Sequence, residues 1–268
     1  MSLTEPLDGR VLCIALAPEL LTAVVRSGAR VLAHSEVRIT AADAEGSWDS
    51  VLSAFRTYLR QAGPTLRGLP IALCITTRWC RLSMLPWSEA LRHEASAARH
   101  AHAHFEAIYG DAARHWSIVC EDAPSGQPCL AFAVERELVS ALQGIALENG
   151  NPRVALESAL SVAARALGPA QHAAMAVIEP GRLVLATLSH GRITGVESQD
   201  CRGPWHSALP KAWQRWRARM PAPDTIGEVA VVSLDQRGSG AELAPPFRAV
   251  VLPEALAPAY AAVMMTAC

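Results

Sequence analysis

The chain has 268 residues, of which 51% are hydrophobic, so it is long enough for one large domain or two small domains with buried cores. Its formal net charge of −1 creates no overall field that would attract nucleic acid or an anionic membrane. Seven cysteines occur without a CxxC pair, which indicates a reducing compartment rather than a disulfide framework.

Neither end of the chain resembles a membrane-targeting segment. The first residues, MSLTEPLDGR, contain no basic region followed by an apolar one, so we expect no signal peptide. The apolar stretch at 249–268 is interrupted by Pro253, Glu254 and Pro258, and we therefore predict a buried last helix rather than a membrane anchor. These features predict a cytoplasmic chain with no membrane span.

Apolar runs in the first 80 residues predict three strands, a helix and a fourth strand. Pro18-Glu19 and Ser27-Gly28 are turn-forming pairs that separate the first three runs. The predicted helix has an apolar stripe and ends at Gly63-Pro64. The expected strands are 11–17, 20–25, 30–37 and 71–77, and the expected helix is 46–62.

The same order of elements returns after residue 174, which predicts an internal repeat. Single residues also match at a constant separation of 157 residues: Gly46 with Gly203, Trp48 with Trp205, Ser50 with Ser207 and Leu52 with Leu209. The second set of expected strands is 175–179, 182–189, 192–198 and 228–234, with a helix at 204–220.

Additional elements separate the two copies. They comprise a strand at 81–85, a long helix at 88–109, a hairpin of 116–121 with 129–135, and helices at 135–150 and 159–168 on either side of a strand at 152–158. A doubled β-β-β-α-β unit predicts an α/β fold with mixed sheets and flanking helices. It resembles the duplicated actin-like (ribonuclease H-like) fold, in which the two copies face each other across a nucleotide cleft. We expect a first lobe at 1–169, with an α+β subdomain inserted at about 78–150, and a second lobe at 170–268.

The inserted segment resembles one family. RWCRLSMLPWSEAL (78–91), a long helix, FEAIYGDAARHW (105–116), and then a hairpin and a helix are similar to the cytoplasmic domain of the type II secretion L protein. The type IV pilus assembly M protein has the same layout, and the absence of a membrane span brings this chain nearer to it. The resemblance covers most of residues 10 to 250. It implies a cytoplasmic protein that lies at the inner membrane through a partner, either an assembly-platform protein or the motor ATPase.

The residues at the expected phosphate-binding turns argue against ATP hydrolysis. Such turns need backbone N–H groups close to phosphates and an acidic residue for the metal and water. The first turn, at Ala17 and Pro18, has no glycine or aspartate, and its proline lacks an N–H. The second, at Glu179, Pro180 and Gly181, keeps one acid and one glycine. We therefore predict a non-catalytic scaffold of a pilus or secretion assembly platform, with no catalytic residue and no cofactor. An active actin-like ATPase or small-molecule kinase with atypical phosphate turns, using ATP and magnesium, is the alternative.

A glycine-rich stretch, QRGSG at 236–240, lies apart from both turns. It has the composition of a loop that cradles an adenosine, and also that of an ordinary solvated loop, which we favour. No Walker A motif occurs in the sequence.

Two features are candidate partner-binding sites. On a helix at 204–220, Lys211, Arg215 and Arg219 share one face, and we expect this basic face to bind an acidic protein. The opposite face carries Leu209, Trp213, Trp216 and Met220, which indicates core packing rather than stacking on nucleic-acid bases. Trp87, after Pro86, is predicted either as an exposed partner anchor or as a residue at the edge of the core.

Histidines and one cysteine complete the candidates. The spacing of Leu91, Ala95, Ala98, His102, Phe105 and Tyr109 predicts one buried helical stripe. It places His100 and His104 on the opposite, solvated face, and we expect no metal site there. Arg78 and Arg81 flank Cys80, but we predict an ordinary buried thiol rather than a reactive one.

Overall fold

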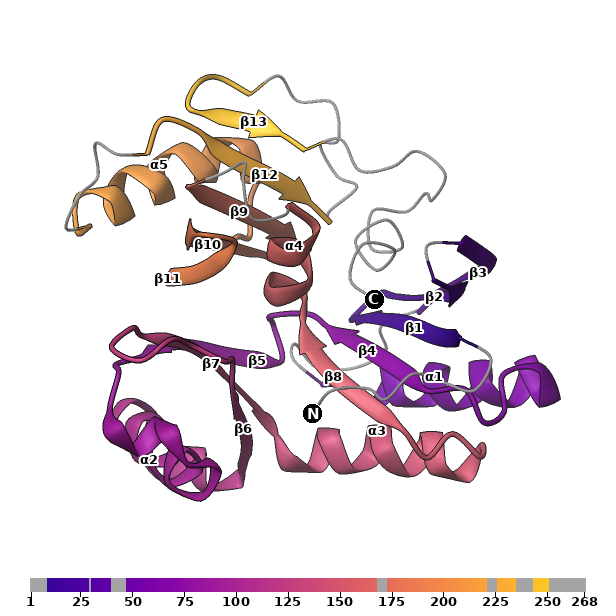
Figure 1. Cartoon of the computed structure of the whole chain (residues 1–268). Coiled ribbons are helices and arrows are strands. Elements are labelled where there is room, and N and C mark those ends of the chain that lie inside the picture. The colour runs from indigo at the N-terminus through magenta and orange to yellow at the C-terminus, as the bar shows by residue number, and fades with distance from the viewer. Residues whose placement is uncertain are drawn as a thin grey trace. The chain divides into compact units, whose positions relative to one another are not determined.

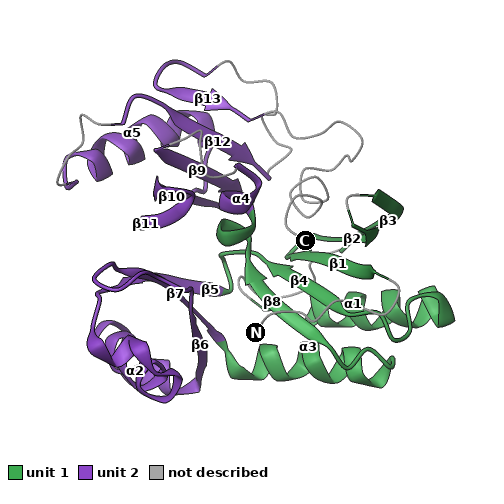
Figure 2. Cartoon of the chain, in the orientation of Figure 1, with its two compact units in different colours: residues 1–79, 135–162, 252–268 green, residues 80–134, 163–251 purple. Residues whose placement is uncertain are grey.

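The computed structural model describes residues 9–28, 30–39, 47–167, 173–220, 226–234 and 243–250. Within them the chain forms two compact units (Figures 1 and 2). Unit 1 includes residues up to 79 together with 135–162, and unit 2 includes 80–134 and 163–251. Each unit contains one five-stranded mixed sheet.

The sheet of unit 1 has the order β3-β2-β1-β4-β8. Its first three strands are antiparallel, and β4 and β8 then add in parallel to β1. Helices α1 and α3 lie side by side and bury leucine-rich stripes (Figure 1). The elements are β1 (Arg10–Ala17), β2 (Leu20–Ser27), β3 (Arg30–Arg38), α1 (Asp49–Ala62), β4 (Ile71–Ile75), α3 (Arg136–Glu148) and β8 (Val154–Ser158). Helix α4 (Ala159–Leu167) begins in unit 1 and ends in unit 2.

The five-stranded sheet of unit 2 has the equivalent order, β11-β10-β9-β12-β13. Helix α5 packs its apolar side chains into the core that the sheet forms, and Trp213 and Trp216 contact each other edge to face. The elements are β9 (Ala174–Glu179), β10 (Arg182–Ser189), β11 (Arg192–Asp200), α5 (Trp205–Arg217), β12 (Val229–Ser233) and β13 (Phe247–Ala249).

The repeat predicted from the sequence is confirmed in detail. Strands β2 and β3 begin at residues 20 and 30, and β10 and β11 begin 162 residues later, at 182 and 192. A β-bulge follows Val25 in the first copy and Thr187 in the second, again 162 residues apart. Both copies therefore share the strand order, the connections and this irregularity.

The inserted segment forms a three-stranded sheet, β5-β7-β6, with α2 packed on it. Strand β5 lies against β11, and Arg192 of β11 donates to the Gln127 side chain at 3.1 Å and to the Asp122 carbonyl at 3.0 Å. Residues 80–134 of the segment thus belong to unit 2, whereas its last part, from 135, belongs to unit 1. The predicted lobe boundaries stay a prediction. Its elements are β5 (Cys80–Leu85), η2 (Glu89–Arg92), α2 (Glu94–Tyr109), η3 (Gly110–His115), β6 (Trp116–Cys120) and β7 (Cys129–Glu135).

The predicted single helix at 88–109 is wrong in one respect. Ser88 caps a short 3-10 turn by accepting a hydrogen bond from the Ala90 N–H at 3.3 Å. His93 then adopts an extended backbone, with φ −130° and ψ 129°, and α2 begins only at Glu94. The predicted last helix at 249–268 and the QRGSG stretch at 236–240 lie outside the described residues, apart from Ala249 and Val250.

Candidate functional site

The first predicted phosphate turn is a two-residue hairpin corner. Ala17 pairs with Leu20, so Pro18 and Glu19 alone connect β1 to β2. Pro18 offers no N–H, and the carbonyl of Glu19 accepts a hydrogen bond from the Ile39 N–H at 3.0 Å. The Glu19 side chain is exposed. This corner presents few of the backbone donors that would surround a phosphate.

The second predicted phosphate turn has the same construction in unit 2. Glu179 pairs with Arg182 across Pro180 and Gly181, and Gly181 adopts a positive φ of 77°. The Gly181 carbonyl accepts from the Cys201 N–H at 2.9 Å. The Glu179 side chain is only 1% exposed. An acid that serves a solvated magnesium ion needs access to that ion, which burial of this carboxylate restricts.

Cys80, at the start of β5, lies close to this second turn. Burial raises the pKa of the Cys80 thiol and the nearby Glu179 carboxylate raises it further, whereas Arg81 and Arg182 act in the opposite direction. Arg182 also pairs with Asp200 at 3.1 Å. The structure therefore supports the prediction that Cys80 is an unreactive thiol, because burial raises its pKa more than Arg81 and Arg182 lower it.

Helix α5 ends at Arg217, so the predicted basic face comprises Lys211 and Arg215 of α5 and Arg219 just after it, and it is partly engaged within the protein. Arg215 donates to the Gln199 side chain at 2.6 Å, and Arg219 forms an ion pair with Glu197 at 2.8 Å, so both lean towards β11. Lys211 is exposed. The opposite face is confirmed as core, since Leu209, Trp213 and Trp216 are buried and Met220 is partly buried. Partner binding by the basic residues stays a prediction.

Trp87 lies in the loop between β5 and η2, after the exposed Pro86. Its side chain is half-buried, which is intermediate between the two predicted environments. Binding of a partner by Trp87 therefore also stays a prediction.

The predicted solvated stripe of His100 and His104 is wrong. The buried residues of α2 are Ala101 and Phe105, and His104 shares a 2.8 Å hydrogen bond with Ser83 of β5. The helix is rotated from the predicted orientation, because the aromatic cluster of Phe105, Tyr109 and Trp116 sets which side faces the sheet. In the part of the chain that the structure describes, no three His, Cys, Asp or Glu side chains form a group suited to a metal.

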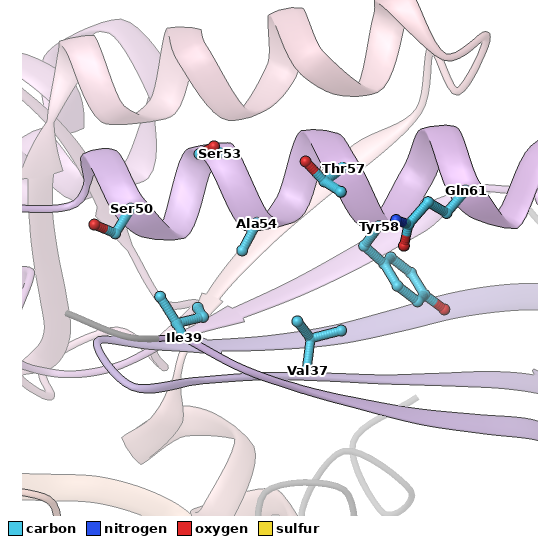
Figure 3. Close-up of a pocket in the computed structure, with 8 residues that line it drawn as sticks. All are labelled: Val37, Ile39, Ser50, Ser53, Ala54, Thr57, Tyr58 and Gln61. Carbon is cyan, nitrogen blue, oxygen red and sulfur yellow. The ribbon is translucent and has the colours of Figure 1, made fainter. Parts of the chain in front are cut away.

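A cavity of about 350 Å³ lies between β3 and α1 in unit 1 (Figure 3). Val37 of β3 and Ile39, just after that strand, line it on one side. Ala54 and Tyr58 of α1 line it on the other, beside the polar residues Ser50, Ser53, Thr57 and Gln61. Burial raises the pKa of Tyr58, and its hydrogen bond with Ser35 partly offsets that effect. None of these eight side chains carries a charge at neutral pH.

Sequence reasoning missed this cavity. Its signal was present in the predicted helix at 46–62, where Ser50, Ser53, Thr57 and Gln61 recur at spacings of three and four residues. The strand that faces it became evident only from the tertiary structure.

Comparison with known proteins shows the fold. No family model matches the chain, and no curated protein sequence matches it. Among solved structures, it is similar to the cytoplasmic domain of EpsL, an inner membrane component of the type II secretion system of Vibrio cholerae. The identity is 10% and the TM-score 0.61, and the match covers 96% of this chain and 94% of that one.

Two further structures agree. A chain of the PilM–PilN type IV pilus biogenesis complex has 11% identity and a TM-score of 0.64, with 90% of this chain and 88% of that chain covered. A Bacteroides thetaiotaomicron protein with an actin-like ATPase fold has 9% identity and a TM-score of 0.58, with 85% and 84% covered. The chain therefore has the actin-like fold, and the resemblance to the secretion L and pilus M proteins is confirmed at the level of the fold.

Proposed function

We propose that this protein is a non-catalytic scaffold of a type IV pilus or type II secretion assembly platform. It docks a protein of the inner membrane and lies on the cytoplasmic side of that membrane through this contact. The observation that carries the proposal is the similarity to the EpsL domain and to a chain of the PilM–PilN complex over at least 88% of either chain in each comparison. The match is thus one of whole architecture, including the inserted subdomain.

Membrane association through a partner agrees with a separate feature. Among the described residues, no helix is both long and apolar enough to cross a bilayer. One of the similar structures is a complex of PilM with PilN, and we propose a corresponding membrane-anchored partner here. The motor ATPase of the same system is the second candidate partner.

The non-catalytic part of the proposal is supported by the two hairpin corners. Pro18 and Pro180 each remove a backbone N–H where an actin-like ATPase would surround phosphates with donors. Glu179, the one acid at the second corner that matches the expected position, is buried. These features favour a scaffold over an active ATPase or small-molecule kinase.

A pull-down with two companion measurements tests the proposal. The complete chain, immobilised, is incubated with each detergent-solubilised membrane protein encoded beside its gene, and also with the motor ATPase. We expect one membrane protein to be retained stoichiometrically. Its soluble cytoplasmic segment should compete with it for the immobilised chain. Thermal unfolding with magnesium and ATP is expected to show no saturable stabilisation. Retention of no platform protein, together with magnesium-dependent stabilisation and phosphate release, would instead support the kinase or ATPase.

A further inference from the structure

Among the strands that the structure describes, β3 lies at the edge of the unit 1 sheet, because β2 is its only neighbour in the strand order. The Ile39 N–H donates to the Glu19 carbonyl, and the register continues through Val37 opposite Leu21 and Ser35 opposite Ala23. Backbone direction alternates along an antiparallel pair. Residues 35, 37 and 39 therefore direct their backbone groups to β2, and residues 34, 36 and 38 direct theirs to the open edge.

This open edge is next to the cavity between β3 and α1. Val37 of β3 and Ile39, just after that strand, project towards the flank of α1 that carries Ser50, Ala54 and Thr57 (Figure 3). From Ser50 to Gln61 the flank extends about 16 Å along the helix axis. An added strand of five residues has about the same length.

The chemistry of the flank suits a polypeptide. The hydroxyl groups of Ser53 and Thr57 and the amide of Gln61 both donate and accept hydrogen bonds, as a peptide backbone requires. Ala54, Val37 and Ile39 leave apolar surface for a small or aliphatic side chain. Because the lining is uncharged, a charged side chain would lose hydration there without gaining an opposite charge.

The rim of the cavity adds an electrostatic preference. Arg60 follows Thr57 by three residues, so it neighbours the lining on the helix surface. It is exposed, and no ion pair to it occurs within the described residues. The next basic residue along the helix, Arg56, is instead paired with Glu148 at 3.6 Å. An acidic side chain of a bound segment would complement Arg60.

We propose that β3 accepts an extended segment of the membrane-anchored partner as an additional strand of the unit 1 sheet. The segment hydrogen-bonds to the outward backbone groups of residues 34, 36 and 38. It places uncharged, small or aliphatic side chains in the cavity beside α1 and an acidic residue near Arg60. This inference rests on the proposed function and names the surface through which that function operates.

The test uses short overlapping synthetic peptides that tile the cytoplasmic segments of the membrane proteins encoded beside this chain's gene. Their binding to the complete chain is measured by fluorescence anisotropy. Glu36→Pro removes one outward N–H and leaves the bonds to β2 in place, since proline is tolerated on the open side of an edge strand. Glu36→Gln is the matched control, because it removes the same charge and keeps the N–H. Ala54→Trp fills the cavity from α1.

We expect a peptide with an uncharged core and a flanking acid to bind. Glu36→Pro and Ala54→Trp should each weaken the affinity for this peptide about tenfold or more, because a hydrogen bond or its surrounding packing is lost. Glu36→Gln should leave the affinity unchanged. Circular dichroism and melting temperature identify variants that fail to fold. For such a variant, the test is instead the rate of amide hydrogen exchange at residues 34, 36 and 38 of the unmodified protein, which the bound peptide should slow. Unchanged affinity in both variants, or no slowing of exchange, overturns the inference.

The remaining outcomes separate this inference from the proposed function. If the intact membrane protein is retained but no peptide binds, docking at β3 by an extended segment is overturned and the scaffold function stands. If neither the peptides nor the intact membrane proteins bind, both are overturned.

Discussion

The Cys201 N–H donates a hydrogen bond to the Gly181 carbonyl at 2.9 Å, and the same bond recurs in the first copy between Ile39 and Glu19 at 3.0 Å. In each copy the donor follows the third strand and the acceptor lies in the corner between the first two strands. Both corners are thus held by hydrogen bonds of the chain's own backbone.

Gly181 is required by this corner, since its φ of 77° is unfavourable for residues with a Cβ atom. Gly181→Ala should lower the free energy of unfolding by about 1–2 kcal/mol. Gly203→Ala is the control, because Gly203 has open space around its Cβ position and no positive φ. Urea unfolding of both variants measures the difference, and equal stability would show that the corner is not strained.

The face of α5 that carries Trp213 and Trp216 packs in the core, whereas the basic face of the same helix does not. Trp213 is 3% exposed, so Trp213→Ala should destabilise the protein by about 3–5 kcal/mol. Lys211→Ala, on the exposed face, should change stability by less than about 0.5 kcal/mol. Chemical denaturation provides both values, and a mild effect of Trp213→Ala would contradict the assigned orientation of α5.

His104 gives the stability of the protein a defined pH dependence. Burial lowers the pKa of His104, and the neighbouring His100 lowers it further. The folded state therefore disfavours protonation, so this contribution is complete above the unfolded-state pKa of about 6.5 and declines as the pH falls below it. Replacing His104 with Gln, which can still bond to Ser83, should flatten this part of the stability profile. The same replacement at the exposed His115 serves as control, and an identical loss of slope in both variants would exclude His104 as the cause.

The basic residues of α5 yield a prediction about the partner. Simultaneous replacement of Lys211, Arg215 and Arg219 by Glu should weaken binding of the retained partner and remove the salt dependence of that binding. Arg219→Gln alone breaks the ion pair with Glu197 and controls for that local change. Unchanged partner affinity in the triple variant would exclude this face as a docking surface.

Most of the fold was predictable because the determining signals are local. Pro18-Glu19 and Pro180-Gly181 predict the two hairpin turns. The recurrence of Trp48 and Leu52 at Trp205 and Leu209 indicates the duplication. The rotation of α2 was not predictable from spacing alone. Alanines on every side of this helix leave its apolar stripe weakly defined, so contacts with Trp116 and Ser83, which lie outside the helix, decide its orientation.

The candidate site was predictable only in part. The corners with Pro18 and Pro180 lie where the predicted strands end, and the neighbourhood of Cys80 and Glu179 became visible only in the tertiary structure. The β3–α1 cavity combines residues from two predicted elements whose distance no sequence pattern specifies. Its polar flank therefore resembled an ordinary solvated helix face.

The affinity of the chain for the cytoplasmic segment of its retained membrane protein, measured by calorimetry with and without magnesium and ATP, tests the scaffold proposal most directly. A nucleotide-independent scaffold predicts a saturable complex with the same dissociation constant in both conditions and no release of phosphate. A complex that forms only with magnesium and ATP, or binding accompanied by ATP hydrolysis, would contradict the proposal.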